Sequence, residues 1–261
     1  MFFDSHAHYW DHRFDEEIGG AAPLLTELFT NGLLGAVNVG TSPNTSRLAI
    51  EQARAFPQLY AAVGIHPSDS GELSSDPDIA VAEIESLIRK KDANKIVALG
   101  EIGLDYHWDD VPREQQMRYF EAQLTLARET AMPVLIHDRE AHGDIHTTVL
   151  RYPGVTGVFH SYSGSYEMAK DLIRRGYYIS FSGTVSFKNA AKVAEVARAL
   201  PREFVLIETD APYLTPHPYR GRLNHSGYLH YTAEALAALW EISVESVAAI
   251  TAENAKRLFG L

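Results

Sequence analysis

The sequence predicts an α/β protein that forms a single (β/α)8 barrel, the TIM-barrel fold, over residues 1–261. Short apolar segments alternate with amphipathic segments of helical spacing along the whole chain, and eight of the apolar segments have the length of strands. Such alternation indicates a parallel sheet buried on both faces. The length of 261 residues is close to the ~250 typical of barrels, and no Pro- or Ser-rich linker divides the chain.

The expected strands follow one another from the N-terminus to about residue 210. In order they are MFFDSH, LLGAVNVG, LYAAVGIH, IVALGEIG, MPVLIH, GVTGVFH, YYISFSG and FVLIETD. Between them, REQQMRYFEAQLTLARET and SYEMAKDLIRRG show clear helical spacing. The segment from Tyr228 to Leu261 predicts two helices, with Ser243 as an N-cap, and we expect it to close the barrel rather than to carry chemistry.

The composition limits the class of protein. A formal charge of -11 argues against a broad basic surface for duplex nucleic acid, but it is compatible with carboxylates that hold cations. No run of about 18 apolar residues and no basic-then-apolar leader occurs, so we expect no membrane association and a cytoplasmic location. The absence of cysteine excludes thiolate metal sites. Nothing in the sequence indicates an obligate protein partner.

Residue types that bind metals stand at the ends of the expected strands. They are His6, His8, His66, Glu101, His137, His160 and Asp210. In a barrel the C-terminal ends of the strands meet at one mouth, so these side chains gather there. A single histidine at a strand end usually has a structural role. Several apolar strands that each end in a polar side chain would be unfavourable unless those side chains had partners to bind. Nitrogen and oxygen ligands without sulfur suit Zn, Mn, Ni or Mg.

The remaining histidines fall in expected loops or helices. There, solvated or capping roles are more common than metal binding, and rim contacts are the most that we expect of His107 and His225. This group comprises His12, His107, His142, His146, His217, His225 and His230.

Six motifs in order, DSHAH, GIHP, GEIGLDY, PVLIH, FHSYSG and ETDAPYL, resemble those of the TatD family of metal-dependent hydrolases, in the amidohydrolase-like group of barrels. The resemblance reaches the terminal TAENAKRLFGL and so covers essentially the whole chain. It implies two divalent ions, one held by His6, His8, Glu101 and Asp210, the other by Glu101, His137 and His160. Glu101 would bridge them, in the place that a carbamylated lysine takes in related barrels.

Two ions about 3.5 to 4 Å apart can lower the pKa of a shared water to roughly 7, which gives a hydroxide nucleophile at neutral pH. The candidate catalytic residues are Glu101, which sets the spacing of the ions, and Asp210, which orients the water and takes its proton. His66 is a candidate for contacting a phosphate or assisting the leaving group, and a structural role for it is equally open.

Substrate contacts are expected from cations and aromatic rings near the motif loops. Arg139 is the first candidate for binding phosphate, before Lys188 and Arg113. The candidates for stacking on bases, for which rim packing is an equal alternative, are Tyr106, Trp108, Tyr162 and Tyr213. Where TatD-like proteins commonly carry Arg, Asn, Glu, Pro, this chain reads RLNHSG from Arg222 to Gly227, so the mouth is expected to differ there.

Three functions follow in order of preference. The first is a deoxyribonuclease with 3' to 5' exonuclease action on single-stranded DNA or RNA ends, as the resemblance implies, with two ions of Mg, Mn or Zn. The second is hydrolysis of a small amide, lactone or phosphoester by the same centre, because one fold serves many reactions. The third is a metal-stabilised scaffold without turnover, which fits poorly because structural zinc sites are usually closed and four-coordinate.

Overall fold

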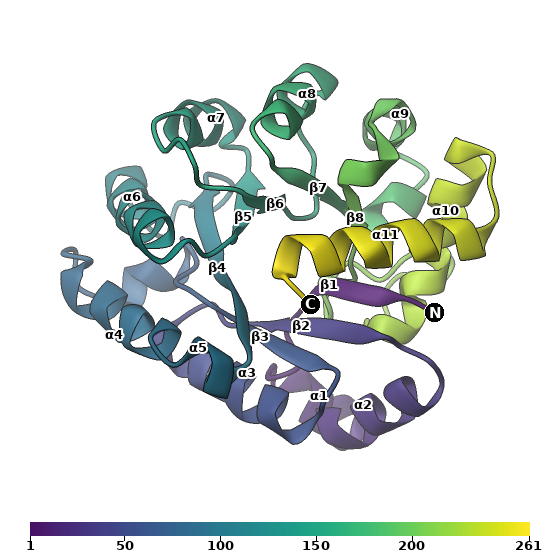
Figure 1. The fold of residues 1–261 in the computed structure, drawn as a ribbon, viewed down its shortest axis with the longest axis horizontal. Helices are drawn as coiled ribbons and strands as arrows, with labels where there is room; N and C mark the ends of the chain where they lie inside the picture. Colours follow the sequence, from purple (N-terminus) through teal and green to yellow (C-terminus); the bar gives the residue numbers. More distant parts are fainter.

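A computed structural model describes residues 1–261 and shows eight parallel strands surrounded by helices (Figure 1). The strands are hydrogen-bonded in the order of the chain, from β1 to β8. The sheet closes where Ala7 pairs with Ala211, and the His8 amide donates to the Ala211 carbonyl at 2.6 Å. The expected (β/α)8 barrel is therefore confirmed. The strands are β1 Phe3–Ala7, β2 Gly35–Val39, β3 Leu59–Val63, β4 Ile96–Asp105, β5 Val134–Arg139, β6 Gly157–Phe159, β7 Tyr178–Phe181 and β8 Val205–Ile207.

Helices form where the apolar spacing predicts them. REQQMRYFEAQLTLARET is α6, and most of SYEMAKDLIRRG is α8. The C-terminal segment forms two helices, and the Ser243 hydroxyl accepts the Ser246 amide proton as the expected N-cap of the second. The helices are α1 Arg13–Ile18, α2 Ala21–Thr30, α3 Pro43–Ala55, α4 Asp78–Ile88, α5 Lys91–Asn94, α6 Arg113–Thr130, α7 His142–Leu150, α8 Tyr166–Arg174, α9 Ala191–Ala199, α10 Leu229–Trp240 and α11 Val244–Phe259. Short 3-10 turns are η1 Asp69–Glu72, η2 Gly183–Ser186, η3 Arg202–Phe204 and η4 Ser226–Tyr228.

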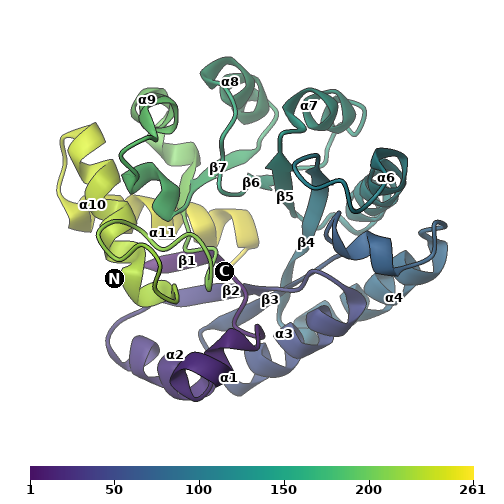
Figure 2. The same ribbon diagram turned by 180° about the vertical axis from the view of Figure 1, so that it is seen from behind.

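Helix α11 covers the end of the barrel at which the strands begin. It lies across that end in Figure 1, and the ring of Phe259 stacks on that of Phe3, the first residue of β1, at 6.2 Å. Ala252, Ala255 and Phe259 join the apolar residues of the barrel interior in one buried cluster. The opposite end, seen in Figure 2, carries the loops that follow the strands. Side chains at the C-terminal ends of the strands therefore face the open mouth.

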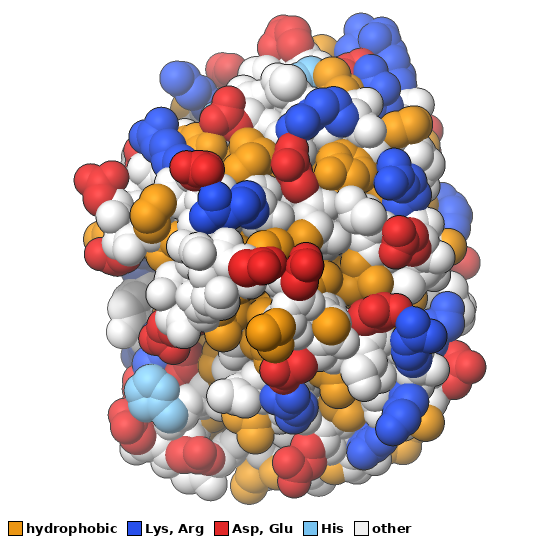
Figure 3. All heavy atoms as spheres, turned by 90° about the vertical axis from the view of Figure 1, so that its left-hand side faces the viewer, with side chains coloured by type: hydrophobic (Ala, Val, Ile, Leu, Met, Phe, Trp, Pro, Cys, Tyr) orange, Lys and Arg blue, Asp and Glu red, His pale blue; other side chains and the backbone are white.

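No single helix is long and apolar enough to span a membrane. The segments Ser226–Trp240 and Val244–Phe259 reach that length and composition only together, and they meet at 106°. Both pack against the barrel, α10 on β8 and α11 on β1 and β8. On the face drawn in Figure 3, acidic and basic side chains are interspersed without a broad basic area.

Strands β4 and β5 extend two residues beyond the ends that their sequences predict, whereas β3 and β8 each end three residues earlier. Glu101 lies in the middle of β4 rather than at its end, and His137 lies two residues before the end of β5. The β4–β5 ladder continues as far as the pair Asp105 and Arg139, because the apolar residues after Glu101 keep packing outward. Strand β3, in contrast, ends three residues before His66.

A buried carboxylate joins the first strand to the last. Asp4 is fully buried and accepts hydrogen bonds from the amide and hydroxyl of Thr209 at 3.0 and 2.6 Å. The hydroxyl of Ser226 donates to it as well, at 2.6 Å. Burial raises the pKa of Asp4 to about 6, although these hydrogen bonds oppose the rise. The network fixes β8 and the loop before α10 against β1.

Candidate metal centre

Four of the expected ligands form one set of donor atoms at the mouth. The Nε2 atoms of His6 and His8 lie 3.2 Å apart. Glu101 Oε2 is 3.3 Å from the first and 3.6 Å from the second, and Asp210 Oδ1 is 3.7 and 3.4 Å from them. An ion with tetrahedral bonds of about 2.1 Å separates its ligands by roughly 3.4 Å. These separations therefore suit one ion between His6, His8 and Glu101, with Asp210 beside the two imidazoles.

A second set lies on the other side of Glu101. Its Oε1 atom is 2.7 Å from His137 Nδ1 and 2.8 Å from His160 Nε2. The two imidazole nitrogens are 3.2 Å apart. Each oxygen of Glu101 thus faces a different set of donors, which is the arrangement of a carboxylate that bridges two ions.

Hydrogen bonds behind the rings fix which nitrogen of each histidine is free to bind metal. His8 Nδ1 lies 2.7 Å from the carbonyl of Val39, so it donates and leaves the lone pair on Nε2. His137 Nε2 lies 3.0 Å from Asp105 Oδ2, so it donates and leaves the lone pair on Nδ1. The free nitrogen of each ring is the one that faces Glu101. The residues present therefore fit a pair of divalent cations.

Sequence reasoning missed Asp105. This buried carboxylate ends β4, and its backbone is held by two hydrogen bonds to the amide side chain of Gln116, each 2.9 Å long. The Oδ1 atom of Asp105, which does not face His137, accepts the amide proton of His107 at 3.0 Å. It could have been found from the motif GEIGLDY, in which Glu101 and Asp105 are four residues apart on one strand and so share a face.

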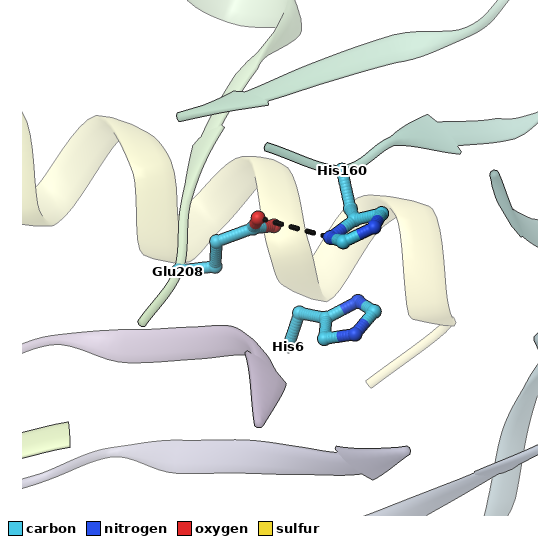
Figure 4. A group of neighbouring side chains, drawn as sticks. All are labelled: His6, His160 and Glu208. Atoms are coloured by element: carbon cyan, nitrogen blue, oxygen red, sulfur yellow. Dashed lines mark ion pairs between the residues drawn. The ribbon is translucent and has the colours of Figure 1, made fainter. Parts of the chain in front are cut away.

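Sequence reasoning also missed Glu208, which is fully buried behind His6 and His160 (Figure 4). Its Oε1 accepts the amide proton of Ser161 at 2.6 Å and lies 3.3 Å from His160 Nδ1. The rings of His6 and His160 stack at 4.1 Å with planes 15° apart. Three atoms of this group are buried without a hydrogen-bond partner, namely His6 Nδ1, His160 Nδ1 and Glu208 Oε2. One carboxylate thus stands behind a ligand of each set.

Replacing Glu208 by glutamine is expected to weaken divalent metal binding by about 10- to 100-fold, because the imidazoles lose the negative charge that favours Nδ1–H and a free Nε2. Titration calorimetry and elemental analysis would measure this. The exposed Glu203→Gln is a matched control. Unchanged affinity in Glu208→Gln would show that the carboxylate does not support the ligands.

Charges within the site are strongly coupled. Burial alone would raise the pKa of Glu101, but the surrounding imidazoles, His160 first, outweigh it and hold that pKa well below its usual value. Burial would lower the pKa of His160, and Glu101 reverses this, so the pKa of His160 lies well above its usual value. The pKa of Asp210 is lowered, because its hydrogen bond to His8 and the charges of His160 and His6 outweigh burial. Both carboxylates are therefore ionised at neutral pH.

Metal binding to the metal-free protein is expected to release protons, and the affinity is expected to rise with pH through 7. The pKa values of His8, His137 and His160 are raised by their carboxylate partners against the effect of burial, so these rings hold protons that a cation must displace. Calorimetry in buffers of different ionisation enthalpy would count the protons. An affinity independent of pH between 6 and 8 would contradict the prediction.

The family model described as "TatD related DNase" matches residues 3–260. The chain belongs to the TatD family. It is 38% identical to the "Uncharacterized metal-dependent hydrolase YabD" of Bacillus subtilis, with 99% of each chain covered. It is 33% identical to the "3'-5' ssDNA/RNA exonuclease TatD" of Escherichia fergusonii, over 91% of this chain and 92% of that one. The crystal structure of the TatD homologue YJJV from Escherichia coli superposes with a TM-score of 0.88 at 28% identity, over 100% of this chain and 98% of the other. The protein is thus a metal-dependent hydrolase, and the expected family is confirmed.

In this TatD-family protein, His66 lies in the site but outside both donor sets. Its Nε2 is 3.6 Å from Glu101 Oε1, and its ring meets that of His137 edge-on at 4.4 Å. Its Nδ1 accepts the Ser68 amide proton at 3.2 Å, so the neutral ring carries its proton on Nε2. Burial, followed by the His137 charge, lowers the pKa of His66 to about 3. His66 is therefore a neutral donor at the mouth.

The cations and rings expected at the rim have different surroundings. The guanidinium of Arg139 lies 5.5 Å from the centre of the half-exposed Trp108 ring, and that of Arg113 lies 4.1 Å over Tyr106. Lys188 is exposed after η2. Tyr213 is 48% exposed, and its ring lies 6.3 Å from that of His8.

The expectation that Tyr162 stacks on bases is wrong. Its ring is buried in the main core, and its hydroxyl donates to the Ser165 carbonyl at 2.7 Å. The residue follows His160 by two positions, but the turn after β6 directs its side chain into the core rather than to the mouth.

The loop that departs from the family pattern closes the barrel. The Asn224 side chain donates to the carbonyls of Thr209 and Tyr213 at 2.8 and 2.6 Å, and Ser226 binds Asp4. His225 caps η4 through Nδ1. The other histidines expected outside the site lie outside both donor sets, and most contact an acidic side chain; these are His12, His107, His142, His146, His217 and His230.

Proposed function

We propose that this TatD-family protein is a phosphodiesterase that removes nucleotides from the 3' end of single-stranded DNA or RNA. The observation that carries the proposal is Glu101, whose two oxygens face two separate sets of donor atoms. We assign His6, His8 and Asp210 to one ion and His137 and His160 to the other, with Glu101 shared.

When bound, two divalent ions would acidify a water molecule between them and neutralise charge on the phosphoryl oxygens. Asp210 then accepts the proton of the attacking water, because it is ionised at neutral pH and borders only one donor set. The Nε2–H of His66 donates to a phosphate oxygen or to the leaving oxygen, a role that fits a ring that stays neutral. Asp105 and Glu208 hold the ligand rings in orientation.

A nucleic-acid substrate is supported by the rim. Two guanidinium groups lie on aromatic rings there, Arg139 on Trp108 and Arg113 on Tyr106, and exposed rings stack on bases of any sequence. Arg139 is our first choice for contacting the scissile phosphate or its neighbour. The relative from Escherichia fergusonii, named for exonuclease activity on single-stranded DNA and RNA, supports the same class of substrate.

The test offers the purified protein, with Mn²⁺ or Mg²⁺, single-stranded DNA and RNA labelled at the 5' end. The expected product is a ladder of labelled strands shortened from the 3' end, and a 3'-blocked oligonucleotide is expected to resist. A panel of lactones, amides and small phosphoesters is run in parallel. Turnover in that panel without cleavage of any oligonucleotide would overturn the proposal in favour of a small-molecule hydrolase. Absence of all turnover in the presence of bound metal would favour a metal-stabilised scaffold.

A further inference from the structure

We propose that a cavity beside the metal centre, formed by α1 and the loops after β7 and β8, binds a backbone phosphate of the substrate at a distance from the bond that is cut. This inference rests on the proposed function and adds a second binding site to it. The cavity has a volume of about 330 Å³, and its lining includes Arg13, Arg220 and Arg222 but only one acidic residue, Glu17. We call it the arginine cavity.

The charges of the arginine cavity are largely uncompensated. Arg220 lies over the ring of Phe187 at 3.8 Å and Arg222 over that of Tyr219 at 5.3 Å, and neither forms an ion pair. Some arginines elsewhere pair with carboxylates, as Arg47 does with Glu83, whereas Arg113 and Arg139 at the rim lie on aromatic rings as these two do. Two guanidinium groups without a carboxylate partner, close to a third, attract an anion.

Arg13 retains donors for a ligand although it is bound to Asp11. Its Nε and Nη2 each donate to that carboxylate at 2.9 Å. A guanidinium has five N–H groups, so three remain. The ion pair and the Tyr213 ring, 4.0 Å from the guanidinium carbon, hold the group in one orientation. A planar, preorganised guanidinium suits the oxygens of a phosphate.

The loop after β8 presents its two arginines from an ordered turn. The Thr215 hydroxyl donates to the Arg222 carbonyl at 2.5 Å, and the Tyr219 amide donates to the Pro216 carbonyl at 2.8 Å. Gly221, between the two arginines, has φ +87°, a conformation that residues with a side chain rarely adopt. In Figure 2 this light-green loop lies beside β1, as the pairing of Ala7 with Ala211 requires.

The arginine cavity is close enough to the metal centre to hold the same strand. Pro212, which lines it, follows Asp210 by two residues. The ring of Tyr213 connects the two, since it lies 6.3 Å from the ring of His8 and under the guanidinium of Arg13. Tyr213 is exposed between the two sites, where a base can stack on it.

The experiment compares a small and a long substrate in the metal-loaded enzyme. The small substrate is bis(p-nitrophenyl) phosphate, which reaches only the metal centre, and the long one is a single-stranded octanucleotide. In the double variant Arg220→Ala, Arg222→Ala, we expect kcat/KM for the octanucleotide to fall by about 10- to 100-fold, mainly through KM, and kcat/KM for the small diester to stay unchanged. The salt dependence of octanucleotide binding should become less steep, by about 0.7 for each phosphate that the variant no longer neutralises.

A matched control is the double variant Arg174→Ala, Arg257→Ala, which removes two exposed arginines from the outer helices α8 and α11. It should leave both substrates unaffected. An equal loss on both substrates in the Arg220, Arg222 variant would show a structural effect and overturn the arginine cavity as a binding site, as would no loss on either. If the unmodified enzyme cleaves the small diester but no oligonucleotide, the proposed nuclease function falls and the cavity's role falls with it.

Discussion

Replacing Glu101 by glutamine is expected to lower kcat by at least about 10³-fold and to reduce the bound metal below two ions per chain. Replacing a residue that only supports a metal ligand typically lowers metal affinity or activity 10- to 100-fold. A larger effect is expected for Glu101, because it faces both donor sets directly, with one oxygen towards each. Glutamine keeps the shape but presents an NH2 group, which cannot bind metal, to one of the sets. Elemental analysis together with the oligonucleotide assay would measure both effects.

The control for this variant is Glu195→Gln on the exposed side of α9. Thermal melting of both metal-free proteins separates loss of the metal centre from loss of the fold. An enzyme that keeps two ions and full turnover without the Glu101 carboxylate would show that the two donor sets are not joined through it.

Replacing Asp210 by asparagine is expected to lower kcat by about 10²- to 10⁴-fold, the range for loss of a positioned acid or base, while KM and bound metal change little. The amide oxygen can still face His8, but the side chain can no longer take a proton. Because the pKa of Asp210 is lowered, we expect any rise in the rate of the unmodified enzyme near neutral pH to come from other groups. The shape of that rise should therefore survive in the variant.

Asp110→Asn, in the exposed loop after β4, is the control for Asp210→Asn. If the metal content of Asp210→Asn falls as steeply as its activity, loss of the ion accounts for the loss of turnover, and Asp210 is a ligand only, without a role as base. Single-turnover measurements at several pH values would distinguish these two outcomes.

The arrangement of the barrel and the convergence of the ligands were predictable because both depend on local patterns. Each apolar run is short enough to be a strand, and parallel topology brings every strand end to one mouth, whatever the sequence separation. His6 and Asp210 therefore meet although 204 positions separate them in the numbering.

The supporting carboxylates were not predictable in the same way. Glu208 and Asp105 follow apolar residues in the sequence, as the ligands do. A carboxylate that supports a ligand differs from a ligand only in which ring nitrogen it faces, and this depends on side-chain geometry. Tyr162 illustrates the opposite error, since it lies within the motif FHSYSG but its side chain is buried in the core. A period-two pattern through Leu206, Glu208 and Asp210 was the available signal for Glu208.

The bond network of Asp4 with Thr209 and Ser226 has a consequence for biosynthesis. A growing polypeptide that has emerged only to β7 lacks Thr209 and Ser226, so the Asp4 carboxylate of its first strand has neither of these partners. Contacts of such long sequence separation form late and slowly. Acquisition of the cations should accordingly follow release from the ribosome rather than accompany translation.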